Sequence, residues 1–157
     1  MANTMRWRYG DTNPVMLPVG TETDVEIGDL VYLDSGEAKP ASDVPDQGSS
    51  LLTVQEFQDN FVGVAMQASP AGDATSIRIA TTGVFEFECD SAVHELGEEI
   101  AVAINLPGDK LFDQKVAATL TMSMAIGRCA KQVTVASTRV LVDIVSVVLR
   151  GGPQEQA

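Results

Sequence analysis

The 157-residue sequence has very few of the side chains on which most metal and catalytic sites depend. It contains one histidine, His94, and two cysteines, Cys89 and Cys129. A single histidine excludes metal sites built on two or three imidazoles, and two cysteines exclude the zinc sites that need three or four. The cysteines lie 40 positions apart, a spacing that matches no zinc or redox motif. We interpret both as small buried apolar residues, with one disulfide between them as the alternative.

Basic residues are also scarce, because 10 Lys and Arg stand against 22 Asp and Glu, for a formal net charge of −12. Binding to nucleic-acid phosphates or to an anionic membrane surface needs a surplus of positive charge, so we expect neither as a direct partner. No apolar run reaches the ~20 residues of a membrane-spanning helix. The first ten residues lack the apolar core of a signal peptide. The sequence thus predicts a protein made and kept in a cytosol, or in a particle assembled there.

The charge is distributed unevenly along the chain. Residues 1–10 carry +2, residues 11–60 carry −10, residues 61–109 carry −7 and residues 110–157 carry +3. Such asymmetry suits a subunit that meets copies of itself, or a larger partner, through unlike surfaces. The alternative is an acidic face that is simply solvated.

Alternation of apolar and polar residues predicts that most of the chain forms β-strands. In residues 84–90 apolar side chains occupy every second position and three acids occupy the positions between them. Residues 119–126 alternate in the same way, and their β-branched residues disfavour the competing helix. Further strands are expected within 25–33 and over 77–79. Residues 139–149 are apolar on both faces, so this strand needs a cover on each side, and a neighbouring subunit could supply the second.

Clusters of Gly, Pro, Asp and Ser separate these strands at residues 34–36, 69–73 and 106–109. One short helix is expected over residues 53–60, whose first and fourth residues have the spacing of a capping box. The chain is therefore expected to be mostly β, as a small barrel or sandwich with at most one short helix.

Two glycine motifs occur twice in the same order, which indicates a duplicated β unit. Gly28 and Gly97 are each followed by an acid and an apolar strand, and Gly63 and Gly127 follow 35 and 30 residues later. The first pair is expected in tight turns that lead into a strand, and the second pair at a bulge or a close backbone approach. Gly83, which lies between the two copies, completes the set of structural glycines. Chance similarity between β segments is the alternative.

Several motifs follow one another in a characteristic order. They are an N-terminal segment, Gly28-Asp29-Leu30-Val31, residues 60–65 (NFVGVA), residues 82–87 (TGVFEF), Gly97-Glu98, residues 125–128 (AIGR) and a Val-rich closing strand. In this order, from about residue 5 to 150, the sequence resembles the capsid cement (decoration) proteins of tailed bacteriophages.

The resemblance implies a small β-barrel domain, related in architecture to the β-tulip of head-stabilising proteins, with an N-terminal arm. Residues 1–18 would form the arm and residues 19–150 a single β-domain, with duplicated units at about 25–90 and 94–149. Residues 151–157 would be a flexible tail.

The function implied by the resemblance is structural and not enzymatic, and it requires no cofactor. Such a protein is made in the host bacterial cytoplasm. It binds the outside of an expanded phage head as a homotrimer and stabilises contacts between major capsid subunits. The alternatives are a cellular oligomeric β-barrel that serves as a binding or scaffold module, and a small hydrolase.

The arm contains the densest cluster of cationic and aromatic residues in the chain: Arg6, Trp7, Arg8 and Tyr9. Aromatic residues and arginine are the types that anchor protein interfaces, so we predict that this cluster meets the capsid or a neighbouring subunit. The alternative is a first β-strand whose Trp7 packs on its own core.

Three acids, Glu86, Glu88 and Asp90, are expected on one face of one strand, ~7 Å apart. Like charges so placed cost stability unless something positive compensates them. Simple solvation, a bound divalent cation, a partner's arm arginines or an intersubunit salt bridge would serve. A neighbouring strand could also offer Arg128, Lys131 or Arg139, and the same three cations are the candidates for charge contacts between subunits.

A Ser-His-Asp triad can be assembled on paper from Ser91, His94 and one of many acids. Ser91, however, lacks the sequence of a nucleophile elbow and falls in an expected strand-end turn. We therefore predict that His94 is a surface or turn histidine.

Overall fold

The structure, a computed structural model, describes residues 6–150, so predictions about residues 1–5 and 151–157 lie outside the described residues. The described chain is mostly β, as the alternation predicts, with eleven strands and one ten-residue helix, α1 (Ser50–Asp59). Two short 3-10 helices, η1 (Ala41–Asp43) and η2 (Met122–Met124), and the four-residue α2 (Val147–Arg150) complete it. Two five-stranded units account for ten of the strands.

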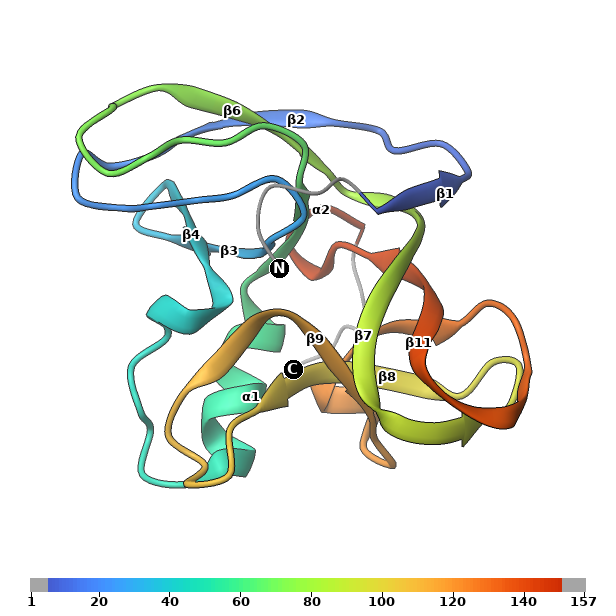
Figure 1. Ribbon diagram of the computed structural model, residues 1–157. Helices are drawn as coiled ribbons and strands as arrows, with labels where there is room; N and C mark the ends of the chain where they lie inside the picture. Colours follow the sequence, from blue (N-terminus) through green and yellow to red (C-terminus); the bar gives the residue numbers. More distant parts are fainter. Residues whose placement is uncertain (1–5, 151–157) are drawn as a thin grey trace.

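The first unit is an antiparallel sheet with the strand order β2-β6-β5-β3-β4, at the upper left of Figure 1. The tight turn at residues 34–36 joins β3 to β4, and α1 lies between β4 and β5. The strands are β2 (Val15–Pro18), β3 (Leu30–Asp34), β4 (Glu37–Pro40), β5 (Phe61–Ala65) and β6 (Ser76–Ala80).

The second unit is a closed barrel with the strand order β7-β11-β10-β8-β9. A parallel contact between Glu88 of β7 and Lys115 of β9 closes it. The three-residue strand β1 (Trp7–Tyr9) is added to β7, beyond the five barrel strands. The barrel strands are β7 (Thr82–His94), β8 (Glu99–Ile104), β9 (Leu111–Ala118), β10 (Ala125–Cys129) and β11 (Val133–Val145). The predicted fold class, a small β-barrel domain, is confirmed.

The two units have the same strand order. In each of them, the first strand in the chain pairs with the fifth, the fifth with the fourth, the fourth with the second and the second with the third. Gly28 and Gly97 stand at equivalent places, each with a positive φ before the second strand of its unit. The Gly28 amide donates to the carbonyl of Ala65 over 2.9 Å, and the Gly97 amide donates to that of Cys129 over 2.8 Å. The order of pairing is thus the same in both units, while their duplication stays a prediction.

Gly63 in β5 and Gly127 in β10 lie where a neighbouring strand passes too close for any side chain. A Cβ at Gly63 would overlap the carbonyl oxygen of Ala80, and one at Gly127 would overlap that of Asp143. The pairing register shifts beside both glycines. Each unit therefore has one position where only a glycine lets three strands stay hydrogen-bonded.

The central strands of the first unit are buried on both faces because each separates two apolar cores. Leu30 and Tyr32 of β3 join the larger core, which contains the barrel interior, whereas Val31 joins the smaller core of the first unit. Phe57 of α1 lies in the larger core beside Phe61 of β5, with ring centroids 5.5 Å apart. The larger core therefore extends across both units and α1 and makes them one body.

The helix expected over residues 53–60 is confirmed, but its start is not. Ser49 is the N-cap and accepts a hydrogen bond from the Leu52 amide, so α1 begins at Ser50. Thr53, predicted as the first residue, is buried within the helix, where its hydroxyl donates to the Ser49 carbonyl. The capping-box spacing was therefore misleading, because a serine four residues earlier supplies the same chemistry.

The strand predicted over residues 119–126 is wrong in its first part. The Thr121 amide donates to the Thr119 hydroxyl, and the Met124 amide donates to the Thr121 carbonyl, so the chain turns into η2 before β10 begins. Side-chain hydrogen bonds of threonine compete with strand pairing in this way. The other long strands are confirmed, although β3 begins only at Leu30. The strand predicted over residues 139–149 is wrong in its last part, because β11 ends at Val145 and α2 follows, where the Ser146 hydroxyl accepts a hydrogen bond from the Leu149 amide.

We predict that Gly63→Ala lowers the free energy of unfolding by ~3 kcal/mol or more, because overlap with main-chain atoms forces the strands apart. Gly127→Ala should behave in the same way. Gly20→Ala is the matched control, since its Cβ would meet only the flexible end of the Glu37 side chain. Urea denaturation measures all three variants, and equal stability of Gly63→Ala and Gly20→Ala would contradict the close approach.

Candidate functional site

The three acids of β7 lie on one face of the strand, as predicted, and each has a cation from its own chain. Glu86 binds Arg8 over 2.7 Å and Arg139 over 3.0 Å. The Asp90 carboxylate lies 2.8 Å from the Lys115 ammonium, and the Glu88 carboxylate lies 3.9 Å from the Arg6 guanidinium. The repulsion expected along this row is therefore compensated within one subunit.

The Arg8 and Arg139 guanidinium groups hold the pKa of Glu86 below its usual range, and the hydrogen bond from Arg8 contributes most. All three side chains are partly exposed to solvent. Exposed pairs of this kind contribute about 0–1 kcal/mol each, so their main effect is to position the two arginines rather than to hold the barrel together.

The other two predicted cations differ in their surroundings. The Arg128 guanidinium lies 3.5 Å from the Glu99 carboxylate and donates a hydrogen bond to the Gly97 carbonyl. Lys131 is exposed and forms no ion pair with any described residue. Intersubunit contacts of these residues stay a prediction, and Lys131 is the one whose charge is free to make such a contact.

The arm residues divide into two pairs. Trp7 and Tyr9 lie in β1 with 45% and 52% of their surface exposed, so Trp7 does not pack into the core. Arg8 is held by Glu86, and Arg6 is buried, with Nε and Nη2 lacking hydrogen-bond partners among the described residues. Trp7 and Tyr9 are thus the accessible aromatic residues of the arm, next to Arg8, which is bound to Glu86.

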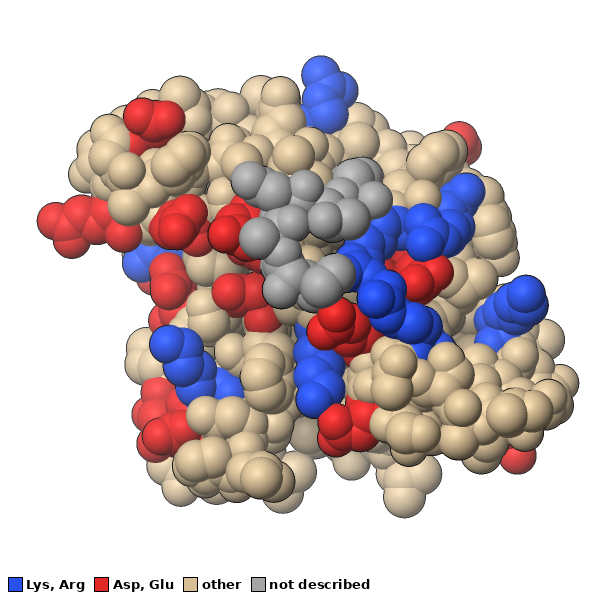
Figure 2. Space-filling view, in the orientation of Figure 1, with Lys and Arg blue, Asp and Glu red and all other residues tan. Residues whose placement is uncertain are grey.

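A groove runs along the outer face of the barrel next to β1, with a volume of about 450 Å³. Three cations line it, Arg8, Lys131 and Arg139, and Glu86 is the one acid in its lining. Leu141 and Val133 add apolar surface. Figure 2 shows a run of blue side chains on this side of the molecule. We call this feature the cationic groove.

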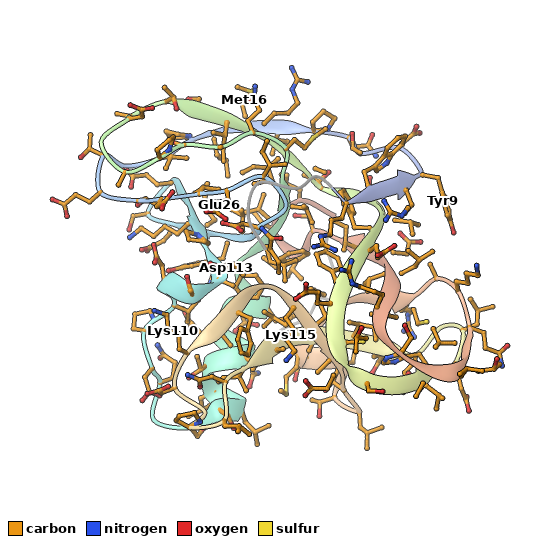
Figure 3. The ribbon with its side chains drawn as sticks, in the orientation of Figure 1. Tyr9, Met16, Glu26, Lys110, Asp113 and Lys115 are labelled. Carbon is orange, nitrogen blue, oxygen red and sulfur yellow. The ribbon has the colours of Figure 1, made fainter. Side chains whose placement is uncertain are left out.

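A second charged region lies around the loop that precedes β3, on η1 and on β9. Glu26 and Asp113 are labelled on the left of Figure 3, away from Tyr9. Asp43 lies close to Asp113 and Asp24, whose charges raise its pKa further after the larger effect of burial. We call the group of Asp24, Glu26, Asp43 and Asp113 the acidic face.

Beneath the acidic face, a buried carboxyl joins the two units. Asp29 Oδ1 accepts a hydrogen bond of 2.8 Å from the side-chain amide of Gln114 in β9, and its Oδ2 accepts one of 2.9 Å from the main-chain amide of Glu26. Burial raises the pKa of Asp29 to about 7, and the charges of Asp113 and Glu26 add to the rise. The sequence marked Gly28-Asp29 only as a turn, because the partner residue Gln114 is 85 positions away.

His94 is buried at the end of β7, so the prediction of a surface or turn histidine is wrong. Its Nδ1 lies 3.0 Å from a Glu98 carboxylate oxygen, and its Nε2 lies 3.8 Å from the Cys89 sulfur. This order of thiol, imidazole and carboxylate resembles a catalytic triad, whereas Ser91 is exposed on β7 and has no part in it. Sequence spacing alone hides the cluster because the chain turns between His94 and Glu98.

The chemistry of this cluster is that of an inert thiol. Cys89 is only 5% exposed, and burial raises the pKa of its thiol. A nucleophilic cysteine needs the opposite, an accessible sulfur with a lowered pKa. Both cysteines are free and buried, as predicted.

Among the residues described, no group of three or more His, Cys, Asp or Glu side chains is arranged to hold a metal ion. Within residues 6–150, no helix is long and apolar enough to cross a membrane.

Comparison with known proteins gives little. No family model matches the chain, and no curated protein is similar to it in sequence. Among solved structures, the chain is similar to the head fiber gp8.5 N base of bacteriophage phi29, with 14% identity and a TM-score of 0.49. The likeness covers 90% of this chain and 99% of that one. The two chains therefore overlap only loosely.

We predict that Asp29 makes the protein less stable as the pH rises from about 4 to about 7. Because its pKa is raised on folding, the folded chain retains a proton in this range that the unfolded chain has lost. Asp29→Asn removes this dependence, so the stability of the variant relative to wild type should rise with pH and level off above 7. Urea denaturation at several pH values measures the difference.

Asp34→Asn provides a control of opposite sign, because Lys39 lowers the pKa of Asp34. That variant should lose stability relative to wild type as the pH rises through the acid range below about 4. A flat difference between Asp29→Asn and wild type from pH 4 to 8 would contradict the buried, proton-retaining carboxyl.

We also predict that both thiols react slowly in the native protein. Cys89 and Cys129 are 5% and 2% exposed, and burial raises both pKa values, so little thiolate is available. Ellman's reagent at pH 8 should label the folded chain about a hundredfold more slowly than the denatured chain, which should show two free thiols. A fast-reacting thiol that disappears in Cys89→Ser would show the triad-like cluster to be active.

Proposed function

We propose that the protein is a structural, non-enzymatic virion protein that binds the outside of an expanded phage head as a homotrimer. There it stabilises contacts between major capsid subunits. The observation that carries the proposal is the ordered motif series of the cement proteins. Gly28 and Gly97 enter equivalent strands, and Gly63 and Gly127 stand at the two close approaches, so the motifs of the resemblance are the ones that build both units.

The arm strand supports the proposal with a surface suited to binding another protein. Trp7 and Tyr9 present half-exposed rings on β1, at the edge of its sheet, and the ion pair with Glu86 holds the side chain of Arg8, which lies between them in the sequence. Aromatic and arginine side chains that are already ordered lose little entropy on binding and anchor many interfaces. This surface would meet the capsid.

The shared core supports the mechanical part of the proposal. Because the larger core runs through both units and α1, a force applied to the arm side is transmitted to the whole body. A rigid protein that binds only the assembled, expanded head stabilises that state by mass action in proportion to its affinity. No chemical turnover is needed for this role.

The hydrolase alternative has little support from the residues. The one constellation of thiol, imidazole and carboxylate has its sulfur buried, with a raised pKa. A cellular scaffold would use the same surfaces as a cement protein, so only the choice of partner separates these two functions.

The test is binding to expanded heads assembled from the cognate capsid protein without this chain. Purified protein should sediment with the heads at a stoichiometric copy number and raise the temperature at which they release DNA. The double variant Trp7→Ala, Tyr9→Ala should weaken binding about tenfold or more, since it removes two aromatic anchors.

Leu106→Ala is the matched control, because Leu106 is fully exposed on the β8–β9 turn, outside the arm. It should bind like wild type. Absence of binding to cognate heads would refute the proposed function, whereas unchanged affinity of the double variant would refute only the role of the arm.

A further inference from the structure

The cationic groove has positive charge that its own chain leaves uncompensated. Glu86 is shared between Arg8 and Arg139, and Lys131 has no ion pair within the described residues. Three cations against one carboxylate leave the groove with two unmatched positive charges. Its apolar lining, at Val133 and Leu141, adds surface that a partner would bury.

The acidic face has the opposite property. None of its four carboxylates forms an ion pair with a Lys or Arg among residues 6–150. Lys39 and Lys110 lie near enough to Asp43 to oppose the rise of its pKa, but Lys39 is itself paired with Asp34, so the four carboxylates remain in excess. Asp113 is stabilised by two hydrogen bonds from Ser42, at 2.7 and 3.1 Å, but these bring no positive charge. Carboxylates gathered in this way repel one another: burial has the largest effect on the pKa of Asp43, and the charges of Asp113 and Asp24 raise it further.

The two surfaces cannot meet within one chain. The cationic groove lies on β1 and β11, whereas the acidic face lies on the loop before β3, on η1 and on β9. Figure 2 shows several red side chains, with blue ones among them, on the left and the blue run on the right of the same view. Neither region therefore meets its counterpart within the described chain, and another molecule could supply it.

We propose that the cationic groove binds the acidic face of a second copy of this chain. The contact relieves repulsion on the acidic face and neutralises the unpaired Lys131 in one step. It joins unlike surfaces, and a repeated contact of that kind generates a ring when the rotation between copies closes. The inference rests on the proposed function, because it supplies the subunit contact of the homotrimer.

The first test reverses the charge of Lys131, the cation of the groove that has no ion pair among the described residues. Lys131→Glu should raise the dissociation constant of the oligomer about tenfold or more, because every contact in the ring then sets like charges opposite each other. Sedimentation equilibrium at 50 and 300 mM NaCl measures it, and added salt should weaken the wild-type oligomer. Arg78→Glu is the matched control, since Arg78 is exposed on β6, outside the groove.

The second test restores complementarity. Asp24 is exposed, and Asp43, although partly desolvated, also reaches the surface. Asp24→Lys, Asp43→Lys should therefore weaken the oligomer on its own and recover it when combined with Lys131→Glu. Combining Lys131→Glu with Asp73→Lys, a reversal on the exposed 69–73 turn, should recover nothing. Near-ultraviolet circular dichroism of each variant shows that its fold is retained.

The outcomes separate this inference from the proposed function. If Lys131→Glu changes the dissociation constant of the trimer no more than Arg78→Glu does, the groove contact is overturned, but the proposed cement function is not. An intact Lys131→Glu trimer that binds heads more weakly shows that the groove takes a capsid segment, which also overturns the second copy as its occupant. A wild-type chain that stays monomeric at all concentrations overturns both the contact and the trimer.

Discussion

The burial of β3 and β5 on both faces is the constraint on which the rest of the structure depends. Each strand separates a small core, shared with β2 and β6, from a larger core that fills the barrel. Two five-stranded units that would otherwise be separate are thereby fused across a common set of aromatic rings, Tyr32, Phe57 and Phe61. Removing that shared layer would leave each unit with an exposed apolar face, which a chain of this size cannot tolerate.

This fusion also decides how charge is arranged on the surface. On the barrel side, β1 pairs with β7, so Arg6 and Arg8 lie beside the acid row and match negative charge there. Around η1 and β9, the four carboxylates of the acidic face form no ion pair with the described chain, although Lys39 and Lys110 lie near Asp43. The acidic face thus carries part of the net charge of −12 in a place where a partner could bind it.

Local patterns in the sequence were sufficient for the architecture. The alternation in residues 84–90 correctly separates Phe85 and Phe87 from the acids between them, because a strand exposes alternate residues to opposite environments. The patterns predicted the wrong structure where side chains form hydrogen bonds with nearby backbone groups. Threonines at 119 and 121 bend the chain into η2, and Ser49 caps α1 ahead of the expected residue. Such local hydrogen bonds leave no mark in hydrophobic periodicity.

The candidate site was less predictable, since its parts come from distant positions. Asp29 meets Gln114 across 85 residues, and Arg8 meets Glu86 across 78. His94 is a related case, because its burial depends on how the chain turns back toward Glu98.

The sequence by itself determined the mostly-β class, the places of the turns, the two repeated glycine motifs and the scarcity of catalytic side chains, all of which are local or compositional. Only the tertiary structure decided which charges are paired, which thiols are buried and which surfaces stay unmatched. These properties depend on contacts between residues far apart in the chain, and on the solvent that those contacts exclude.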